Sequence, residues 1–310
     1  MKKDLLDLRE LSKEEINNLI KSAENMKKNP LGYSEILKNK TLLMMFEKPS
    51  LRTRVSFEVG MTQLGGHAIY YDISTSPMGK KESIADTAKT ASRYADIIMA
   101  RLFKHSDIKE LAENSSIPVI NALTDSHHPC QILADLLTIK EKKGSLNGLK
   151  IAYFGDGNNN VTHSLLLGCA ICGINVSIAC PESDNFKPDT EILEISKKIS
   201  EKSGAKIILT HEIKQAAESA DVIYTDSWMS YHIPENKKEE RIKLLDQYQV
   251  TEEIINYAKE DCIFMHCLPA MRGVEVTSEV IDGNKSVVFE QAENRLHMQK
   301  ALMLKLLGVN

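Results

Sequence analysis

Short apolar runs alternate with longer amphipathic segments along most of this chain, and this pattern restricts the fold more than any other feature. A parallel strand pair needs a long crossover connection, usually a helix, so the alternation predicts parallel sheets with helices on both faces. The predicted strands are residues 42–46, 68–71, 97–100 and 118–120, followed by residues 150–154, 175–179, 206–209, 221–224, 262–265 and 286–289.

Helical periodicity fills the segments between these runs. A capping box at Ser12-Lys-Glu-Glu15 predicts a first helix that ends near Lys28. Residues 291–307 have the pattern of one amphipathic helix at the end of the chain. Further helices are predicted at residues 52–64, 83–94, 107–114 and 129–142.

A polar, glycine-containing break at Lys143-Gly-Ser-Leu-Asn-Gly148 separates the two β/α series. A length of 310 residues also favours two domains over one. We therefore expect an α/β protein with two doubly wound parallel-sheet domains. The first should be residues 1–146 and the second residues 147–290, with a C-terminal helix, residues 291–310, that packs back on the first domain.

Composition and charge exclude several classes of partner. The net charge of −4 gives no basic surface for nucleic acid or for an anionic membrane. Residues 1–11 lack the apolar core of a secretory signal, and no apolar run reaches the roughly 20 residues that span a bilayer. We expect a cytoplasmic protein whose cysteines are reduced.

Two local patterns permit more than one interpretation. Cys169 and Cys172 form a C-x-x-C, but they stand in an apolar helical run, so we expect two small buried residues rather than a redox or metal site. The turn Gly155-Asp-Gly-Asn-Asn-Asn160 follows a strand and resembles a dinucleotide fingerprint, although Asn160 occupies the third glycine position. A non-catalytic nucleotide-binding module remains an alternative on this evidence.

The segment Ser50-Leu-Arg-Thr-Arg54 begins a predicted helix directly after a strand. The free amide groups and the positive dipole end of a helix start favour an anion, and guanidinium groups suit phosphate oxygens. A capped helix start exposed to solvent would show the same residue types. The residues alone leave both readings open.

The segment Glu47-Lys-Pro-Ser-Leu-Arg-Thr-Arg-Val-Ser-Phe-Glu58 resembles the carbamoyl phosphate motif of the aspartate/ornithine carbamoyltransferase superfamily. Further segments match this superfamily in the expected order, so the resemblance covers essentially the whole chain. They are Met99-Ala-Arg101, His128-Pro-Cys-Gln131, Phe264-Met-His-Cys-Leu-Pro269 and Glu293-Asn-Arg295.

The resemblance implies transfer of a carbamoyl group from carbamoyl phosphate to L-ornithine, giving citrulline and phosphate. It assigns catalysis to Arg101, His128, Asp226 and Cys267. The residues that it assigns to carbamoyl phosphate are Ser50, Leu51, Arg52, Thr53, Arg54, Arg101, His128, Gln131, Cys267, Leu268 and Arg295. Those that it assigns to ornithine are Asn159 or Asn160, Asp226, Ser230 and Tyr231.

The implied chemistry is a direct attack of a neutral amine on the carbamoyl carbon. A free alkylammonium has a pKa near ~10.4, so the site must select or generate the neutral form. Cationic donors at the carbonyl oxygen stabilise the developing charge, and no metal or organic cofactor is expected. A covalent mechanism with His266 and Cys267 is disfavoured, since neighbours on a strand point to opposite faces.

Some positions depart from the family pattern. Tyr231 and His232 stand where ornithine enzymes usually have Met-Gly, and Pro77 stands where the family often has Gln. Another amine, such as putrescine or a modified ornithine, is therefore an alternative acceptor. The resemblance further implies arginine biosynthesis and a homotrimer or a multiple of it, with no nucleic acid or membrane partner.

Overall fold

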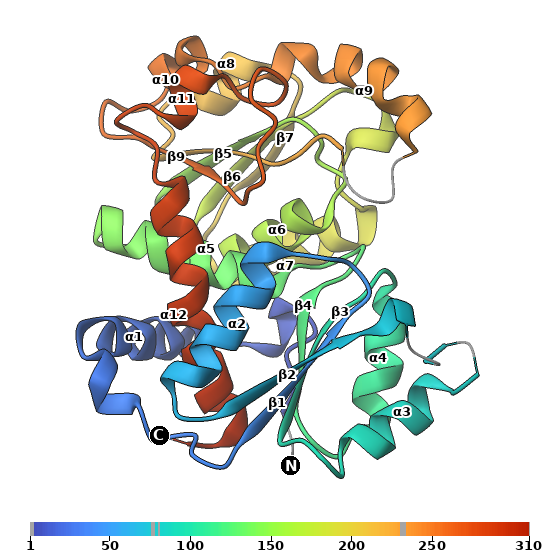
Figure 1. Ribbon diagram of the computed structural model, residues 1–310. Helices are drawn as coiled ribbons and strands as arrows, with labels where there is room; N and C mark the ends of the chain where they lie inside the picture. The colour runs from blue at the N-terminus through green and yellow to red at the C-terminus, as the bar shows by residue number, and fades with distance from the viewer. Residues whose placement is uncertain (1–2, 76–77, 80, 230–233, 310) are drawn as a thin grey trace. The chain divides into compact units, whose positions relative to one another are not determined.

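The computed structural model describes residues 3–75, 78–79, 81–229 and 234–309, and the chain divides into two compact units (Figure 1). Unit 1 comprises Met1–Leu137 and Glu293–Asn310, and unit 2 comprises Thr138–Ala292. Each unit contains one parallel sheet, so the fold class is the α/β architecture that the sequence predicted. Among the described residues, no helix has the length and apolar character needed to cross a membrane.

Unit 1 contains a four-stranded parallel sheet in the order β2-β1-β3-β4. Its strands are β1 (Thr41–Phe46), β2 (His67–Asp72), β3 (Ile97–Arg101) and β4 (Val119–Leu123). Its helices are α1 (Lys13–Lys28), α2 (Leu51–Gln63), α3 (Ile84–Ala91), α4 (His105–Asn114) and the first part of α5 (Pro129–Lys143), together with most of α12 (Val288–Leu307).

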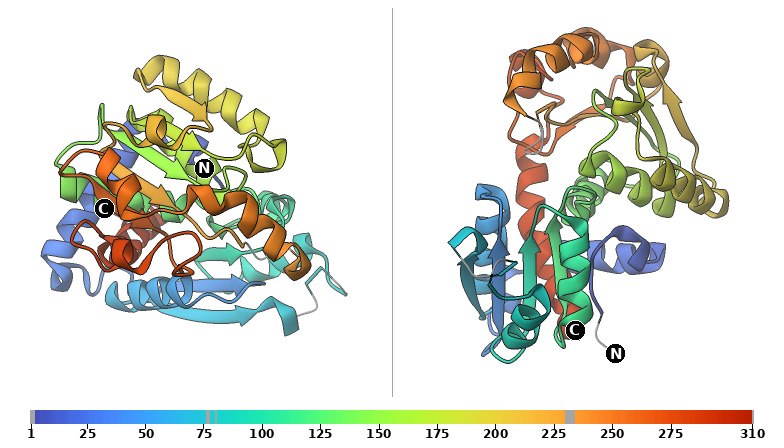
Figure 2. Two further views of the ribbon diagram at one scale, coloured as in Figure 1. Left: turned by 90° about the horizontal axis from the view of Figure 1, so that it is seen from above. Right: turned by 90° about the vertical axis from the view of Figure 1, so that its right-hand side faces the viewer.

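Helices cover both faces of this sheet. α3 and α4 pack together over a core that includes Met45 and Ile98 from the strands. α2 packs beside α12, because Gly60 has no side chain and lies close to Lys300 and Leu296 (Figures 1 and 2). The last helix therefore packs back on the first unit, as predicted.

Polar contacts fix α12 against three helices of unit 1. Lys300 Nζ donates to Gln63 Oε1 of α2 at 2.9 Å. Lys305 Nζ lies 2.8 Å from Glu15 Oε1 of α1. Arg295 Nη1 donates to Gln131 Oε1 of α5 at 2.7 Å. The end of the chain thus supplies side chains to a unit built mainly from its first half.

Unit 2 contains a five-stranded parallel sheet in the order β7-β6-β5-β8-β9. Its strands are β5 (Lys150–Phe154), β6 (Asn175–Ala179), β7 (Ile207–Thr210), β8 (Val222–Thr225) and β9 (Ile263–His266). Its helices are α6 (Asn160–Cys172), α7 (Thr190–Ser203), α8 (Ile213–Ala217), α9 (Lys238–Leu245), α10 (Glu252–Tyr257) and α11 (Ser278–Ile281). Cys169 and Cys172 are buried in α6, as expected.

One predicted strand is wrong. Residues 286–289 do not form a strand: Ser286 makes a single bridge to Phe264, and α12 begins at Val288. The last helix therefore starts three residues before the predicted Gln291. A short apolar run looks the same in a buried strand and in the first turn of a helix, so periodicity could not separate the two.

Both sheets reverse their strand order next to a central strand. In unit 1 the chain moves outward from β1 to β2 and then returns to the other side at β3. In unit 2 it moves outward from β5 to β7 and returns at β8. Ligands of open α/β sheets bind beyond the carboxyl ends of the strands at such reversals. The residues that follow β1, β3, β5 and β8 are therefore the candidates for binding.

The capping box at α1 gives a direct test of the helix start. Ser12 Oγ accepts the Glu15 amide at 3.1 Å, and Glu15 Oε2 accepts the Ser12 amide at 3.0 Å. Ser12→Ala should lower the free energy of unfolding by about 1 kcal/mol, because the helix loses its N-cap acceptor. Denaturant titration measures the change. Asn17→Ala, an exposed change within α1, serves as the control and should shift stability by less than about 0.5 kcal/mol.

Candidate active site

The turn between β1 and α2 forms a capped helix start at the strand reversal of unit 1. Ser50 is the N-cap residue: its Oγ accepts the Thr53 amide at 3.2 Å and lies 3.1 Å from Thr53 Oγ1. The cap fixes the Thr53 side chain in the first turn of α2. The dipole of this helix start adds a positive potential that favours an anion.

Two buried arginine side chains converge on Thr53. Arg101 Nη1 lies 3.5 Å from Thr53 Oγ1, and Arg295 Nη2 lies 3.3 Å from the same oxygen. All three side chains are buried. Two buried positive charges that share one neutral hydroxyl form an arrangement that a bound anion would stabilise. We call Thr53, Arg101 and Arg295 the Thr53 cluster.

The pairing of β3 with β4 is irregular at Arg101. The register of β3 against β4 shifts between Ala100 and Arg101, while Arg101 stays paired with Phe46 of β1. Bulges of this kind re-aim side chains and are common next to functional sites. The shift occurs at the strand end that carries the arginine of the cluster.

Gln131 holds Arg295 in place. Its Oε1 accepts Arg295 Nη1 at 2.7 Å, and its Nε2 donates to Asp135 Oδ1 at 2.8 Å. Both ends of the amide therefore contact protein groups. The carboxylate of Asp135 contacts Gln131, which in turn contacts Arg295 of the cluster. Gln131 and Arg295 are both predicted to bind carbamoyl phosphate, and the contacts of Gln131 hold Arg295 in position.

Burial and, after it, the positive charge of the cluster lower the pKa of two neighbouring groups. Burial, followed by the charges of Arg295 and Arg101, holds the pKa of His128 well below its usual range, so the ring is neutral at pH 7. Burial and then Arg101 lower the pKa of Lys48 to about 8. Lys48 was not among the predicted site residues, although it lies inside the matched motif, because the sequence does not show that this lysine is buried.

The remaining predicted phosphate residues lie outside the Thr53 cluster. Leu51 is exposed, and Arg52 is partly exposed. Arg54 lies over the ring of Tyr70, with its Cζ 4.0 Å from the ring centroid, and its Nε donates to Glu58 at 3.2 Å. The structure thus separates the motif into a buried part at Thr53 and an exposed part at these three residues.

In unit 2, the turn after β5 contains the predicted asparagine ligands. Asn159 is the N-cap of α6: its Oδ1 accepts the amides of Val161 and Thr162, each at 2.9 Å. Its Nδ2 donates to Tyr153 Oη at 2.9 Å and to the Asp156 carbonyl at 2.6 Å. These four bonds use the whole amide in folding the turn, whereas Asn160 is the more exposed of the two asparagines.

The strand reversal of unit 2 brings Asp226 and Cys267 together. Asp226 follows β8 and Cys267 follows β9, and Cys267 Sγ donates to Asp226 Oδ1 at 2.7 Å. The Ser227 amide donates to the same oxygen at 2.7 Å. Burial raises the pKa of Asp226, and the attraction of His266 and these two hydrogen bonds oppose that rise. A thiol and a buried carboxylate therefore lie side by side at the edge where ligands bind.

The expectation that His266 and Cys267 face opposite ways is wrong. Ligand atoms of Asp226, His266 and Cys267 all lie within 4.8 Å of one another. The alternation rule fails because β9 ends at His266, and Cys267 is the first residue beyond the strand. A Cys–His nucleophile is still not formed, because His266 Nδ1 accepts the Leu268 amide at 2.8 Å and Nε2 lies 3.3 Å from Glu275 Oε1.

An ion pair that the sequence analysis missed supports the same region. Arg241 of α9 forms a salt bridge with Asp156, and its Nε donates to the Trp228 carbonyl at 2.6 Å. Burial raises the pKa of Asp156 to about 6, although Arg241 opposes the rise. Arg241 lies in a charged segment that the sequence shows only as a solvent-exposed helix.

Of the remaining predicted site residues, Leu268 is partly exposed and has a φ of 56°. Ser230 and Tyr231 lie outside the described residues, as do Pro77 and His232.

Comparison with protein families matches both parts of the chain. Residues 3–141 match the carbamoyl-P binding domain of aspartate/ornithine carbamoyltransferase. Residues 147–306 match the Asp/Orn binding domain of the same family.

Individual relatives match over nearly the full chain. The ornithine carbamoyltransferase of Carboxydothermus hydrogenoformans is 50% identical over 308 residues, which cover 99% of this chain and 98% of the relative. That of Methanosarcina acetivorans is 51% identical and covers 99% of this chain and 100% of the relative. The solved structure of the ornithine carbamoyltransferase from Pyrococcus furiosus superposes with a TM-score of 0.94 at 46% identity, over 99% of this chain and 97% of that one.

The raised pKa of Asp226 predicts a specific dependence of stability on pH. The folded protein holds the Asp226 proton more tightly than the unfolded chain, so the free energy of unfolding falls as pH rises above the ordinary value of 3.8. Asn at position 226 cannot ionise, so Asp226→Asn avoids this loss of stability. Its amide oxygen can still accept the hydrogen bond from Cys267. The variant should have a higher Tm than the parent at pH 8, by roughly 2–4 °C per kcal/mol recovered.

The difference in Tm should close as the pH approaches 3.8, where both states of the parent protein become protonated. Asp246→Asn makes the same change of charge at an exposed site and should leave Tm unchanged at both pH values. A lower Tm for Asp226→Asn at pH 8 would show that the charged carboxylate stabilises the fold.

Proposed function

Because this chain belongs to the aspartate/ornithine carbamoyltransferase family, we propose that it transfers the carbamoyl group of carbamoyl phosphate to L-ornithine, giving L-citrulline and phosphate. The observation that supports this most strongly is the convergence of Arg101 and Arg295 on Thr53 at a helix start. That arrangement suits a small phosphorylated substrate, and relatives about 50% identical over nearly the full chain are ornithine carbamoyltransferases.

Carbamoyl phosphate binds at the Thr53 cluster in this proposal. The phosphate lies at the start of α2, where Ser50, Leu51 and Thr53 supply amide and hydroxyl groups and Arg52, Arg54 and Arg295 supply charge. Arg101 and His128 hold the carbonyl oxygen, and Gln131 lies near the carbamoyl nitrogen. Cys267 and Leu268 are the remaining residues proposed to contact carbamoyl phosphate.

The protonation state of His128 fits this role. A neutral imidazole donates a hydrogen bond to the carbonyl oxygen without adding a third positive charge to Arg101 and Arg295. Negative charge develops on that oxygen when the amine attacks, and preorganised donors stabilise it. The arginines stabilise the phosphate as it leaves.

Ornithine binds at the group formed by Asp226 and Cys267. The carboxylate of Asp226 orients the side-chain amine, which attacks as the neutral form after it loses a proton. Cys267 shares its thiol proton with Asp226 and so fixes the orientation of that carboxylate. The thiol acts in positioning, and no covalent cysteine intermediate forms.

The amino-acid end of ornithine binds Asn160, Ser230 and Tyr231 in this proposal. Asn160 is preferred over Asn159, because the amide of Asn159 already makes four hydrogen bonds that build the turn. Substitution of Asn159 should therefore act on the fold of the turn before it acts on substrate contacts.

The broader assignments are also proposals. We assign carbamoyl phosphate binding to residues 1–146 and ornithine binding to residues 147–290, with residues 291–310 returning to the first domain. The protein works as a cytoplasmic homotrimer, or a multiple of it, in arginine biosynthesis. The chemistry needs no metal or organic cofactor, because charge stabilisation and alignment of the two substrates accelerate the attack.

A substrate panel tests the acceptor. Purified protein with carbamoyl phosphate should form citrulline from ornithine with a kcat/KM at least a hundredfold above that for putrescine or N-acetylornithine. The panel matters because Tyr231 and His232 replace the usual Met-Gly of ornithine enzymes. A hundredfold preference for another amine would contradict the ornithine assignment and keep the carbamoyltransferase assignment.

A further inference from the structure

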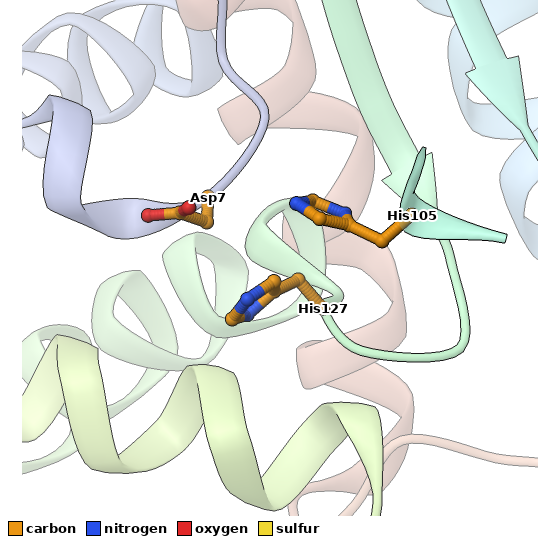
Figure 3. A group of neighbouring side chains, drawn as sticks. All are labelled: Asp7, His105 and His127. Carbon is orange, nitrogen blue, oxygen red and sulfur yellow. The ribbon is translucent and has the colours of Figure 1, made fainter. Parts of the chain in front are cut away.

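Asp7, His105 and His127 come from three separate segments of unit 1 and meet in its interior (Figure 3). Asp7 caps the short 3-10 helix Leu8–Glu10, His105 begins α4, and His127 lies in the loop between β4 and α5. One ligand atom from each residue lies within 4.8 Å of the others, and all three side chains are more than nine-tenths buried. The proposed reaction does not use this group.

We propose that Asp7, His105 and His127 bind a divalent transition-metal ion of the Zn²⁺ class. Two imidazoles and one carboxylate are a common donor set for zinc, with water in the fourth position. The ion would join the N-terminal segment to α4 and to the β4–α5 loop, whose next residue is His128. The proposal does not depend on the reaction that the protein catalyses.

The contacts of His105 support a ligand at its Nε2 atom. This atom is buried and makes no hydrogen bond within the described part of the chain, and a buried unsatisfied group needs an explanation. The other ring nitrogen, Nδ1, lies 3.0 Å from Thr124 Oγ1. A hydrogen bond at one ring nitrogen that orients the other toward a ligand is the usual arrangement of metal-binding histidines.

The environment of Thr124 indicates the tautomer of His105. The Thr124 hydroxyl lies 3.5 Å from the His127 carbonyl, to which it can donate its own proton. Its oxygen, which also accepts the His127 amide at 3.3 Å, then accepts a hydrogen bond from His105 Nδ1–H, and this tautomer leaves the lone pair on Nε2. Burial also lowers the pKa of His105, which favours the neutral ring that a metal requires.

Asp7 keeps one acceptor position despite its contact with Arg9. Its Oδ1 accepts the Arg9 amide at 2.8 Å and Arg9 Nε at 2.9 Å, and its Oδ2 accepts Arg9 Nη2 at 2.7 Å. An ionised carboxylate offers about four lone-pair positions, so Oδ2 can accept a metal as well. The positive charge of Arg9 opposes the ion, which predicts that Arg9 weakens metal binding.

Metal binding requires a small contraction of the group. Zinc–nitrogen bonds are about 2.0–2.1 Å, so ligand atoms of a tetrahedral site lie roughly 3.3–3.5 Å apart. Atoms up to 4.8 Å apart must therefore move by about 1 Å. Asp7 and His127 lie outside the strands, where the backbone can follow such a movement without breaking the sheet.

Zinc titration of the full chain tests the site. The parent should be a Cys267→Ser variant, because Asp226, His266 and Cys267 also bring ligand atoms together. Calorimetry should show one zinc ion per chain, and His105→Gln and His127→Gln should each weaken binding at least tenfold. The control is His67→Gln, an exposed histidine of the same unit, which should bind zinc as the parent does. Thermal melts with a chelator establish that each variant is folded, and added zinc should raise the Tm of the parent and of His67→Gln but not that of His105→Gln or His127→Gln.

Arg9→Gln separates the metal site from a purely structural ion pair. Removal of the competing charge should tighten zinc binding severalfold if Asp7 is a ligand. If Asp7 serves only as the ion-pair partner of Arg9 and is not a ligand, Arg9→Gln should leave zinc affinity unchanged. The proposal is overturned if the parent binds no zinc, if both glutamine variants keep the parent affinity, or if Arg9→Gln binds zinc no more tightly than the parent.

Discussion

Two buried guanidinium groups that share the hydroxyl of Thr53 are the constraint on which the rest of unit 1 depends. Arg101 reaches Thr53 from the end of β3, which pairs with β1, so the contact depends on β3 lying next to β1 in the strand order β2-β1-β3-β4. Arg295 reaches the same oxygen from α12, so the site also requires the last helix to return to the first unit. Gln131 and Asp135 then hold Arg295 from α5. The fold thus concentrates positive charge at a capped helix start, and the phosphorylated substrate proposed for this site would supply the compensating negative charge.

Unit 2 also has a parallel sheet with a strand reversal, but the buried group at its reversal is acidic rather than basic. Its strand reversal lies between β5 and β8, and the buried carboxylate of Asp226 follows β8. Burial of this group disfavours its ionised form, and hydrogen bonds from Cys267 and the Ser227 amide reduce that cost. A carboxylate at this position suits a substrate with a cationic amine. Each unit therefore carries the charge opposite to that of the substrate group proposed for it, which explains how one fold serves two unlike substrates.

The sequence predicted the parallel α/β fold, nine of the strands, the capping box at Ser12 and the motif at Ser50 and Thr53. These features depend on local patterns and on order along the chain. It failed where the outcome depends on contacts between distant segments. Residues 286–289 read as a strand because a short apolar run is ambiguous, and the proximity of His266 and Cys267 depends on where β9 ends. Three further features depend on partners that no local sequence pattern connects. They are the structural role of Asn159, the ion pair of Arg241 with Asp156, and the proximity of Asp7 to two histidines.

The central claim is that the Thr53 cluster binds the phosphorylated substrate and stabilises its transition state. The most direct measurement is kcat/KM for carbamoyl phosphate in Arg101→Met, with ornithine saturating. We predict a loss of about 10²–10³, the usual effect of removing one donor to a developing charge. Lys109→Ala removes one positive charge from the exposed surface of α4 and should change kcat/KM less than about threefold. A folded Arg101→Met protein whose kcat/KM also stays within threefold of the parent would contradict the claim.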